Sequence, residues 1–306
     1  ACLPLMSDSM ATGTENSMSD NEIDYQQVLE TASGVFDKKL FFITGLTRSG
    51  TIWLQKAINA HSQVSCRGEA HFADILFPAL GNAATTYNKR VVRIGKQLEA
   101  SGLGDSAGAQ LGLTNNDVST LMATAMSLVM SRWNGSKNVT CIGERTTEYG
   151  HMLKDLAHVL PQAKIVNVIR DGRDEAVSVY DYNIRINASG FLSKFEDFAA
   201  FAGHFAGNWN RDVGAARYYA RNNPDNYMEI RSEELHTEAA HDLARLCRFL
   251  GIDDSDDMVS SCVDAGRRAA LPDGVIGQWR DRFDDAATKA FMRQSGELLK
   301  LLEYEG

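Results

Sequence analysis

The segment Phe41–Leu54, which runs FFITGLTRSGTIWL, constrains the fold more than any other part of the chain. Residues 38–44 have the aromatic and β-branched content of a buried strand, and the residues after Gly50 resume an apolar pattern with helical spacing. Gly45 and Gly50 allow the chain to turn sharply between them, with backbone N–H groups directed at an anion near the helix N-terminus. The pattern predicts a strand, an anion-binding loop and a helix.

This loop departs from the phosphate loop of nucleoside triphosphatases in the position of its cation. Such a loop needs a lysine directly after the second glycine, and here Gly50 is followed by Thr51 and Ile52. The cation is Arg48 instead, and its planar guanidinium can grip two oxygens of a phosphate or sulfate group. For these residues alone, a tight strand-to-helix turn with a solvated arginine is the alternative.

A second stretch, residues 163–178 (AKIVNVIRDGRDEAVS), also combines a strand with a cation. Its continuous apolar run indicates an interior strand of a parallel sheet, covered on both faces. A nucleotide hydrolase would end such a strand on an acid for magnesium, whereas this one ends on Arg170. Ser178, in the following helix, could face the same ligand. We expect a second anion here, separate from the one at Arg48, with a solvated cluster of charges as the alternative.

Two further pairs of polar residues follow expected strands. Glu69 and His71 lie at a strand-to-helix junction, the edge where sheet proteins place chemistry. Glu69 could instead complement the helix dipole, and His71 could be a partly buried structural imidazole. Glu144 and Arg145 follow the expected strand 138–143 and are similarly placed, with a surface ion pair as the ordinary alternative.

The composition predicts one large globular domain, since 44% of the 306 residues are hydrophobic and 23% are charged. A net charge of -9 argues against a nucleic-acid or anionic-membrane partner. The five cysteines are scattered without metal-ligand spacing, so we expect no disulfide framework, no metal site and a reducing compartment. No segment approaches the roughly 20 apolar residues of a membrane span.

The first 22 residues are polar and lack the apolar run of a signal or anchor, so we expect a disordered tail over 1–22 and a single domain over 23–306. Glycosylation sequons at Asn134, Asn138 and Asn187 leave a Golgi lumen open as a setting, but the cytoplasm is favoured.

Strand and helix patterns alternate along the rest of the chain. Together they predict an α/β, P-loop-like three-layer fold, with a central parallel β-sheet flanked by helices and a site at the strand carboxyl ends. The helical pattern that begins at Phe72 is expected to stop at Gly81, and residues 87–112 give only a weak helical signal. The helix 239–250 is expected to end at Gly251.

These motifs resemble those of one family. Residues 47–54 resemble the 5′-phosphosulfate-binding loop of sulfotransferases that use 3′-phosphoadenosine-5′-phosphosulfate (PAPS), and residues 168–178 resemble their 3′-phosphate-binding strand and helix. Residues 228–235 and 246–251 look like a recurring late segment of the family, and residues 274–280 are similar to its C-terminal nucleotide-covering loop. The resemblance runs from about Leu40 to Phe283 and so covers nearly the whole expected domain.

The resemblance implies transfer of a sulfuryl group from PAPS to an acceptor hydroxyl or amine, with 3′-phosphoadenosine-5′-phosphate (PAP) as product and no obligatory metal. The acceptor would be a hydroxylated small molecule or a carrier-bound one. The residues implied to bind the donor are Arg48, Ser49, Gly50, Thr51, Ile52, Trp53, Arg170, Ser178, Gly274, Gly277 and Arg280. Arg48 would also act in catalysis by stabilising the leaving group.

Gly68-Glu69 looks like the glycine-glutamate pair of the members that use a catalytic carboxylate, which include tyrosylprotein and many bacterial sulfotransferases. Glu69 is therefore the first choice for the general base, and His71 is the second, because the cytosolic small-molecule branch uses a histidine. The sequence departs from that branch at Pro272 and Asp273, where a basic pair would stand, and Arg267 or Arg268 could substitute.

Two other functions stay open at the level of sequence. A P-loop kinase that uses ATP and magnesium is disfavoured by Thr51 in the lysine position, and a non-catalytic nucleotide-binding protein of the same fold would keep the same motifs. Residues 72–116 and 182–210 are expected to shape the acceptor pocket, but neither has a pattern diagnostic of an acceptor class.

Overall fold

The structure is a computed structural model that describes residues 24–102, 112–133, 139–188, 190–269 and 276–304. The expected tail over 1–22, the sequons at Asn134 and Asn138, and the segment that contains Pro272, Asp273 and Gly274 lie outside the described residues.

Five parallel strands form the central sheet, in the order β2-β3-β1-β4-β5. The strands are β1 (Lys39–Thr44), β2 (Val64–Gly68), β3 (Cys141–Arg145), β4 (Lys164–Ile169) and β5 (Tyr227–Arg231). The predicted α/β class with a central parallel sheet flanked by helices is thereby confirmed. Strand β3 is shifted relative to the expected 138–143, so Glu144 and Arg145 lie within the strand, and they are buried.

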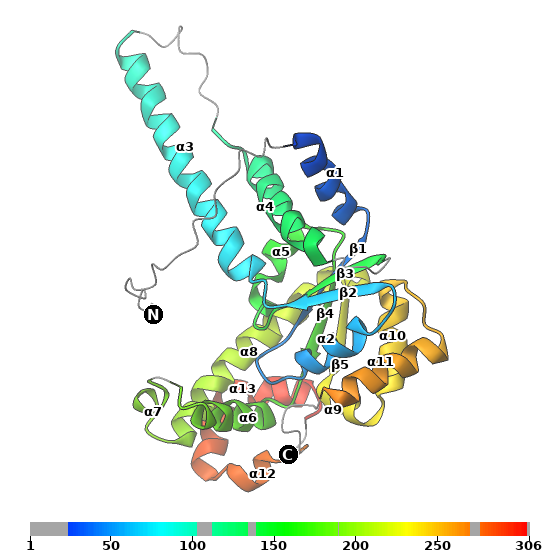
Figure 1. Ribbon diagram of the computed structural model, residues 1–306. Helices are drawn as coiled ribbons and strands as arrows, with labels where there is room; N and C mark the ends of the chain where they lie inside the picture. Colours follow the sequence, from blue (N-terminus) through cyan, green and yellow to red (C-terminus); the bar gives the residue numbers. More distant parts are fainter. Residues whose placement is uncertain (1–23, 103–111, 134–138, 189, 270–275, 305–306) are drawn as a thin grey trace, which may run out of the picture.

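Helices cover both faces of the sheet, and the central strand β1 shows why (Figure 1). Successive side chains of a strand point to opposite faces. Phe41 and Ile43 belong to a core shared with the first group of helices, and Leu40 and Phe42 belong to a core shared with the second. The first group is α2 (Thr51–Asn59), α9 (Ser232–Thr237), α10 (Ala239–Leu250) and α11 (Asp256–Arg268). The second is α1 (Tyr25–Phe36), α4 (Asn115–Met130), α5 (Leu153–Val159) and the end of α8 (Phe198–Asn222). Helix α10 ends as predicted, with Gly251 in the left-handed conformation.

A third core lies beyond the carboxyl ends of the strands. It packs α6 (Gly172–Arg185) and α8 against α13 (Asp285–Leu301), around Trp209 and Phe291. Short helices α7 (Phe191–Lys194) and α12 (Trp279–Arg282) border this unit. The packing of α8 and α13 thus holds α6 in place beside the edge of the sheet where the strands end.

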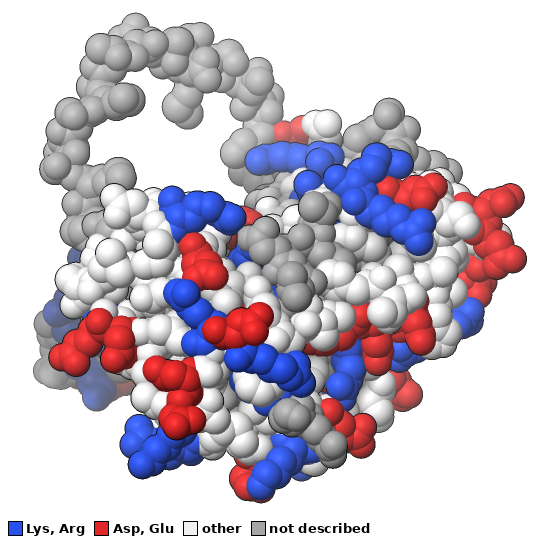
Figure 2. Space-filling model, turned by 90° about the horizontal axis from the view of Figure 1, so that it is seen from below, with Lys and Arg blue, Asp and Glu red and all other residues white. Residues whose placement is uncertain are grey.

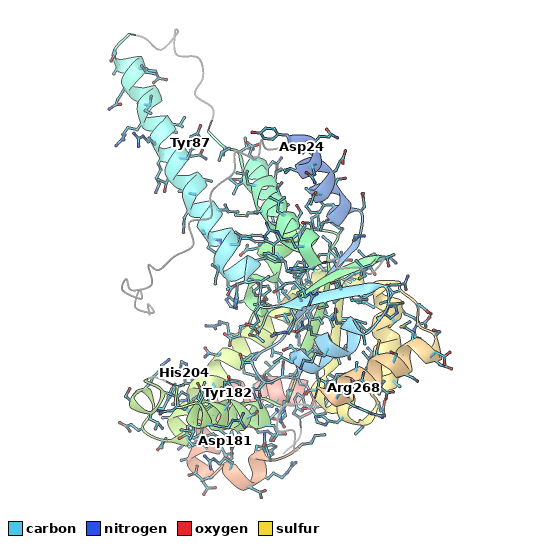
Figure 3. All side chains as sticks on the ribbon, viewed as in Figure 1. Asp24, Tyr87, Asp181, Tyr182, His204 and Arg268 are labelled. Carbon is cyan, nitrogen blue, oxygen red and sulfur yellow. The ribbon has the colours of Figure 1, made fainter. Side chains whose placement is uncertain are left out.

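The expected helix stop at Gly81 is wrong. A π-helical turn (Phe72–Leu76) leads into α3 (Phe77–Ala100), which continues through Gly81. A glycine destabilises a helix by only about 1 kcal/mol, and packing of α3 against α4 offsets that cost. The two helices lie close together here, because a Cβ at Gly81 would be 3.6 Å from Met122 Cε of α4. The outer half of α3 projects from the body, and Tyr87 on it lies far from Tyr182 of α6 (Figure 3). That half of α3 is therefore remote from the edge where the strands end.

Charged side chains of both signs lie intermingled on the face shown in Figure 2, which is the lower end of the molecule in Figure 1. Among the residues that the structure describes, no helix combines the length and the apolar character needed to cross a bilayer.

Candidate active site

The loop between β1 and α2 has the geometry that its sequence predicts. Gly45 and Gly50 have φ values of 147° and 106°. A Cβ on Gly45 would lie 2.3 Å from the carbonyl oxygen of Val168, so only glycine fits there. Arg48 also adopts a left-handed φ of 76°, a conformation that costs a non-glycine residue about 1 kcal/mol or more. The loop keeps this strained conformation, as functional loops often do.

The two predicted anion-binding groups are neighbours. Arg48 Nε donates to the Ser178 hydroxyl at 3.0 Å, and Arg170 Nη1 donates to the carbonyl oxygen of Arg48 at 3.2 Å. The guanidinium of Arg48 also lies 5.4 Å from the centre of the Tyr182 ring. The loop after β1 is therefore in direct contact with the segment from Arg170 to Ser178, and Arg48 and Arg170 carry guanidinium groups of the kind that bind phosphate and sulfate.

A cavity of about 480 Å³ connects this loop with the end of β2. The residues that line it are Thr47, Arg48, Gly50, Thr51, Ile52, Glu69, Arg145, Thr147, Tyr182 and Ala269. Cations from β3 and the loop after β1 thus share one cavity with a carboxylate from the loop after β2.

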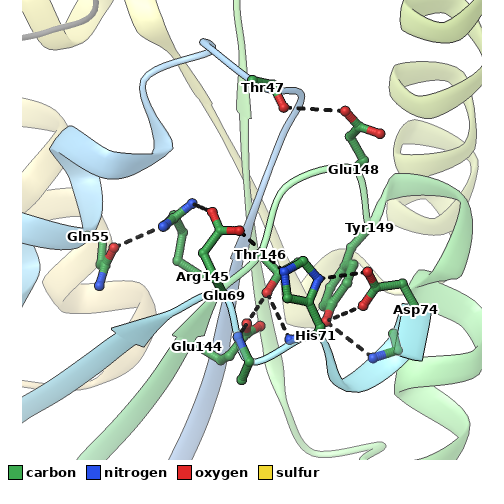
Figure 4. A network of polar contacts seen from close by, with 12 residues as sticks. Thr47, Gln55, Glu69, His71, Asp74, Glu144, Arg145, Thr146, Glu148 and Tyr149 are labelled. Atoms are coloured by element: carbon green, nitrogen blue, oxygen red, sulfur yellow. Dashed lines mark hydrogen bonds and ion pairs between the residues drawn. The ribbon is translucent and has the colours of Figure 1, made fainter. Parts of the chain in front are cut away.

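Glu69 lies in this cavity between two partners (Figure 4). Its Oε1 is 2.5 Å from Arg145 Nη1, and its Oε2 is 3.3 Å from His71 Nε2. Half of the Glu69 side chain is exposed, whereas Arg145 is 6% exposed and also donates to Gln55 at 3.0 Å. The absence of a side chain on Gly68 makes room for Arg145, since a Cβ there would lie 2.6 Å from Arg145 Nη2.

Glu144 and Arg145 do not form the surface ion pair that was the ordinary alternative for them. Both are buried, and both contact the loop after β2. Arg145 contacts Glu69, and Glu144 accepts a hydrogen bond from the Ala70 N–H at 3.1 Å. Glu144 also accepts from the Thr146 hydroxyl. Burial raises the pKa of Glu144 to about 7, although these hydrogen bonds oppose the rise. The sequence signal was a pair of charges at the end of a strand.

His71 turns its other ring nitrogen to Asp74. Its Nδ1 is 2.7 Å from Asp74 Oδ2, and this hydrogen bond raises the pKa of His71 above its usual value. Both Glu69 and His71 have left-handed φ values, 62° and 54°. His71 is not part of the cavity lining, whereas Glu69 is.

Asp174 ties the turn of residues 276–279, here called the C-terminal turn, to α6. The Asp174 carboxylate accepts from the backbone N–H groups of Gly277 at 2.7 Å and Trp279 at 2.9 Å. The guanidinium of Arg173 lies 3.8 Å from the centre of the Trp279 ring. These contacts place Gly277 beside the helix that carries Ser178, with Arg280 stacked on Trp279 at 4.7 Å.

Ile52 and Trp53 point in different directions. Ile52 is 48% exposed and lines the cavity that contains Glu69. Trp53 is buried against Gly266 of α11 and forms one wall of a second cavity, of about 700 Å³, which also contacts His236 and Arg267.

The described part of the chain contains no group of three or more His, Cys, Asp or Glu side chains placed to hold a metal ion.

A family match shows the class of protein. The model of the sulfotransferase family matches residues 41–256, and the chain belongs to that family. Over 217 residues it is 24% identical to protein-tyrosine sulfotransferase 1 of Danio rerio, which covers 71% of this chain and 54% of that protein. The chain therefore spans about half the length of this relative.

Solved structures show the same fold. Mouse sulfotransferase SULT7A1, complexed with PAP, aligns with a TM-score of 0.53 at 17% identity, over 88% of this chain and 89% of that one. Sulfotransferase STF9 from Mycobacterium avium aligns with a TM-score of 0.56 at 11% identity, over 91% of this chain and 79% of that one.

Proposed function

We propose that this protein transfers a sulfuryl group from PAPS to an acceptor hydroxyl or amine. The observation that carries the proposal is the cavity that joins the Arg48 loop to Glu69 and Arg145. One side of it suits the anionic donor, and the other offers a carboxylate to the acceptor. Membership of the sulfotransferase family and the PAP complex of mouse SULT7A1 support the same donor.

The donor would lie across the two cationic groups. Backbone N–H groups at the start of α2, together with Arg48, Ser49 and Thr51, would bind the 5′-phosphosulfate. Arg170 and Ser178 would bind the 3′-phosphate, whose presence distinguishes PAPS from ATP. Arg48, from the first group, is in contact with Ser178, from the second. The 5′-phosphosulfate and the 3′-phosphate of one nucleotide can therefore be bound side by side.

The remaining nucleotide contacts would come from Trp53 and the C-terminal turn. The cavity of about 700 Å³ that Trp53 borders has room for a purine ring. Gly277, whose N–H donates to Asp174, and Arg280, which lies over the Trp279 ring, would cover the nucleotide from the side of α6. Arg267 lines the cavity beside Trp53 and is the candidate to replace the missing basic pair.

The reaction needs in-line attack, loss of a proton from the acceptor and stabilisation of the leaving group. The acceptor oxygen would form a bond to sulfur while the bond between sulfur and the bridging phosphate oxygen breaks, and the electron pair would stay on PAP. Arg48 would stabilise the charge that develops on that oxygen, and Arg145 would stabilise the sulfuryl group. Glu69 would take the proton, since it lines the cavity and is half exposed, whereas His71 lies behind it.

The acceptor class is proposed as hydroxylated small molecules or carrier-bound hydroxyl groups, and the setting as the cytoplasm. The residues that line the cavity beside Glu69 include Ile52 and Tyr182, which offer an apolar and an aromatic surface to the body of an acceptor.

Two measurements test the proposal. Thermal unfolding is followed with PAP and with Mg-ATP, and we expect stabilisation by PAP. Stabilisation by Mg-ATP alone would indicate a kinase instead. Labelled PAPS is then incubated with a panel of acceptors, namely 4-nitrophenol, a tyrosine-containing peptide, a glucosamine oligosaccharide and a metabolite extract, and sulfated products are detected by mass spectrometry. Binding of PAP without any product would indicate a non-catalytic nucleotide-binding protein.

The Glu69→Gln variant tests the base. It should leave PAP affinity nearly unchanged and lower turnover by about a hundredfold or more, because the amide cannot accept the acceptor proton. Glu297→Gln, at a side chain exposed on the surface, is the matched control and should behave as the parent. Normal turnover in Glu69→Gln would rule out Glu69 as the base.

A further inference from the structure

A chain of three ionisable side chains leads away from the cavity (Figure 4). Glu69 Oε2 is 3.3 Å from His71 Nε2, and His71 Nδ1 is 2.7 Å from Asp74 Oδ2. The second oxygen of Asp74 accepts from the Tyr149 hydroxyl at 3.4 Å. The imidazole therefore uses both of its nitrogens, one toward the carboxylate in the cavity and one toward a carboxylate behind it.

The loop that presents this chain is held in an unusual conformation. Glu69 and His71 both have positive φ, and the residue between them, Ala70, donates its N–H to the buried Glu144. The backbone N–H of Glu69 donates to the carbonyl oxygen of Arg145 at 2.7 Å. A loop with strained residues keeps its conformation only because contacts with the surrounding structure hold it in place. Such loops are concentrated at functional sites.

We propose that His71, oriented by Asp74, is a positioning residue that acts through Glu69: it takes the acceptor proton from the Glu69 carboxyl group, which Arg145 holds from the other side. This inference rests on the proposed function, because it assigns a path for the proton that sulfuryl transfer releases.

The step balances without any further reactant. Asp74 accepts the Nδ1–H of His71, which leaves the lone pair of neutral Nε2 facing Glu69. The proton passes from the acceptor hydroxyl to Glu69 Oε2 and from there to Nε2, so that Glu69 returns to a carboxylate and His71 becomes an imidazolium. Asp74 stabilises that cation. The His71 side chain is 36% exposed, so the proton can then leave to water.

The surroundings of His71 set the pH at which this path operates. The groups that face it are Asp74 on the π-helical turn, Glu69 on its own loop and Glu144 on β3, and the Asp74 hydrogen bond is the main cause of its raised pKa. Arg145 and Tyr149 reach it only through Glu69 and Asp74. An imidazolium cannot accept a proton, so the rate should rise with pH as His71 loses its proton.

The first experiment measures the tautomer and titration of His71 by NMR of the ¹⁵N-histidine-labelled protein bound to PAP, with the His71→Asn variant to assign its signal. We expect the neutral ring to carry its proton on Nδ1, and we expect Asp74→Asn to lower the pKa of His71. A neutral ring protonated on Nε2, or the same titration in Asp74→Asn and the parent, would overturn the proposal.

The second experiment measures kcat and KM against pH, with PAPS and the acceptor from the panel above that gives most product. His71→Asn is used because asparagine tolerates positive φ. It should lower kcat by about tenfold, leave the KM for PAPS unchanged and shift the acid limb of the profile to lower pH. His151→Asn is the control, because His151 contacts Asp212 in the same manner at 3.1 Å outside this chain of contacts.

The outcomes separate the two proposals. A His71→Asn profile that coincides with the parent and with His151→Asn overturns the role of His71 while sulfuryl transfer stands. Absence of product with every acceptor, together with absence of PAP binding, overturns the proposed function and with it the proton path.

Discussion

Glu144→Gln should change how the stability of the protein depends on pH. The Glu144 carboxyl is fully buried, and burial raises its pKa from 4.5 to about 7. Its pKa in the folded state is therefore above that in the unfolded state, so the unfolded chain loses this proton first as pH rises. The stability that the protonated carboxyl contributes is complete below pH 4.5 and is lost as pH rises toward 7.

The size of the effect follows from the two pKa values. Each pKa unit corresponds to about 1.4 kcal/mol, so complete ionisation of the folded-state carboxyl costs about 3 kcal/mol. Between pH 5 and pH 8, the free energy of unfolding of the parent should fall by about 2.5 kcal/mol relative to Glu144→Gln. The amide also leaves its NH₂ group in the buried position of Oε2, which has no hydrogen-bond partner, but that penalty does not depend on pH.

The assay is urea unfolding of both proteins at pH 5, 6, 7 and 8, followed by circular dichroism. Glu297→Gln, which changes an exposed glutamate, should parallel the parent at every pH. A difference between the parent and Glu144→Gln that stays constant within about 0.5 kcal/mol over this range would refute the reasoning, because it would show that the buried carboxyl titrates as in the unfolded chain.

Three other substitutions test the remaining parts of the site. Gly68→Ala should displace the Arg145 guanidinium, from which the added Cβ would lie 2.6 Å, so turnover should fall by about tenfold while PAP affinity measured by calorimetry is kept. Arg170→Ala removes a charge-assisted contact and should weaken PAP binding by roughly 10- to 100-fold in the same measurement, and unchanged affinity would exclude its role at the 3′-phosphate. Asp174→Asn should weaken the hydrogen bonds that hold the turn 276–279, so limited proteolysis should cleave that turn faster and PAP should be released faster. Equal cleavage of the variant and the parent would contradict the role of Asp174 in holding this turn.

Local patterns in the sequence determined the framework of the fold. The strand, loop and helix around Gly45 and Gly50 depend on residues within one short segment, and the structure has them where the pattern predicts. The continuous apolar run before Arg170 likewise predicted an interior strand, and β4 lies between β1 and β5. The expected stop at Gly81 failed because packing of α3 against α4 outweighs the low helix propensity of one glycine.

The partners of Glu69 were decided by tertiary structure alone. The sequence indicated that Glu69 follows a strand, but it gave no strand order, and 76 residues separate Glu69 from Arg145. The parallel register of β2 and β3 places Gly68 opposite Arg145, which brings the cation to the carboxylate. Asp174 and the turn 276–279 are joined in the same way by the packing of distant helices. A sequence pattern reports the periodicity and turn chemistry of neighbours along the chain, whereas the contacts that fix a carboxylate in its site depend on which strand ends become neighbours in the sheet.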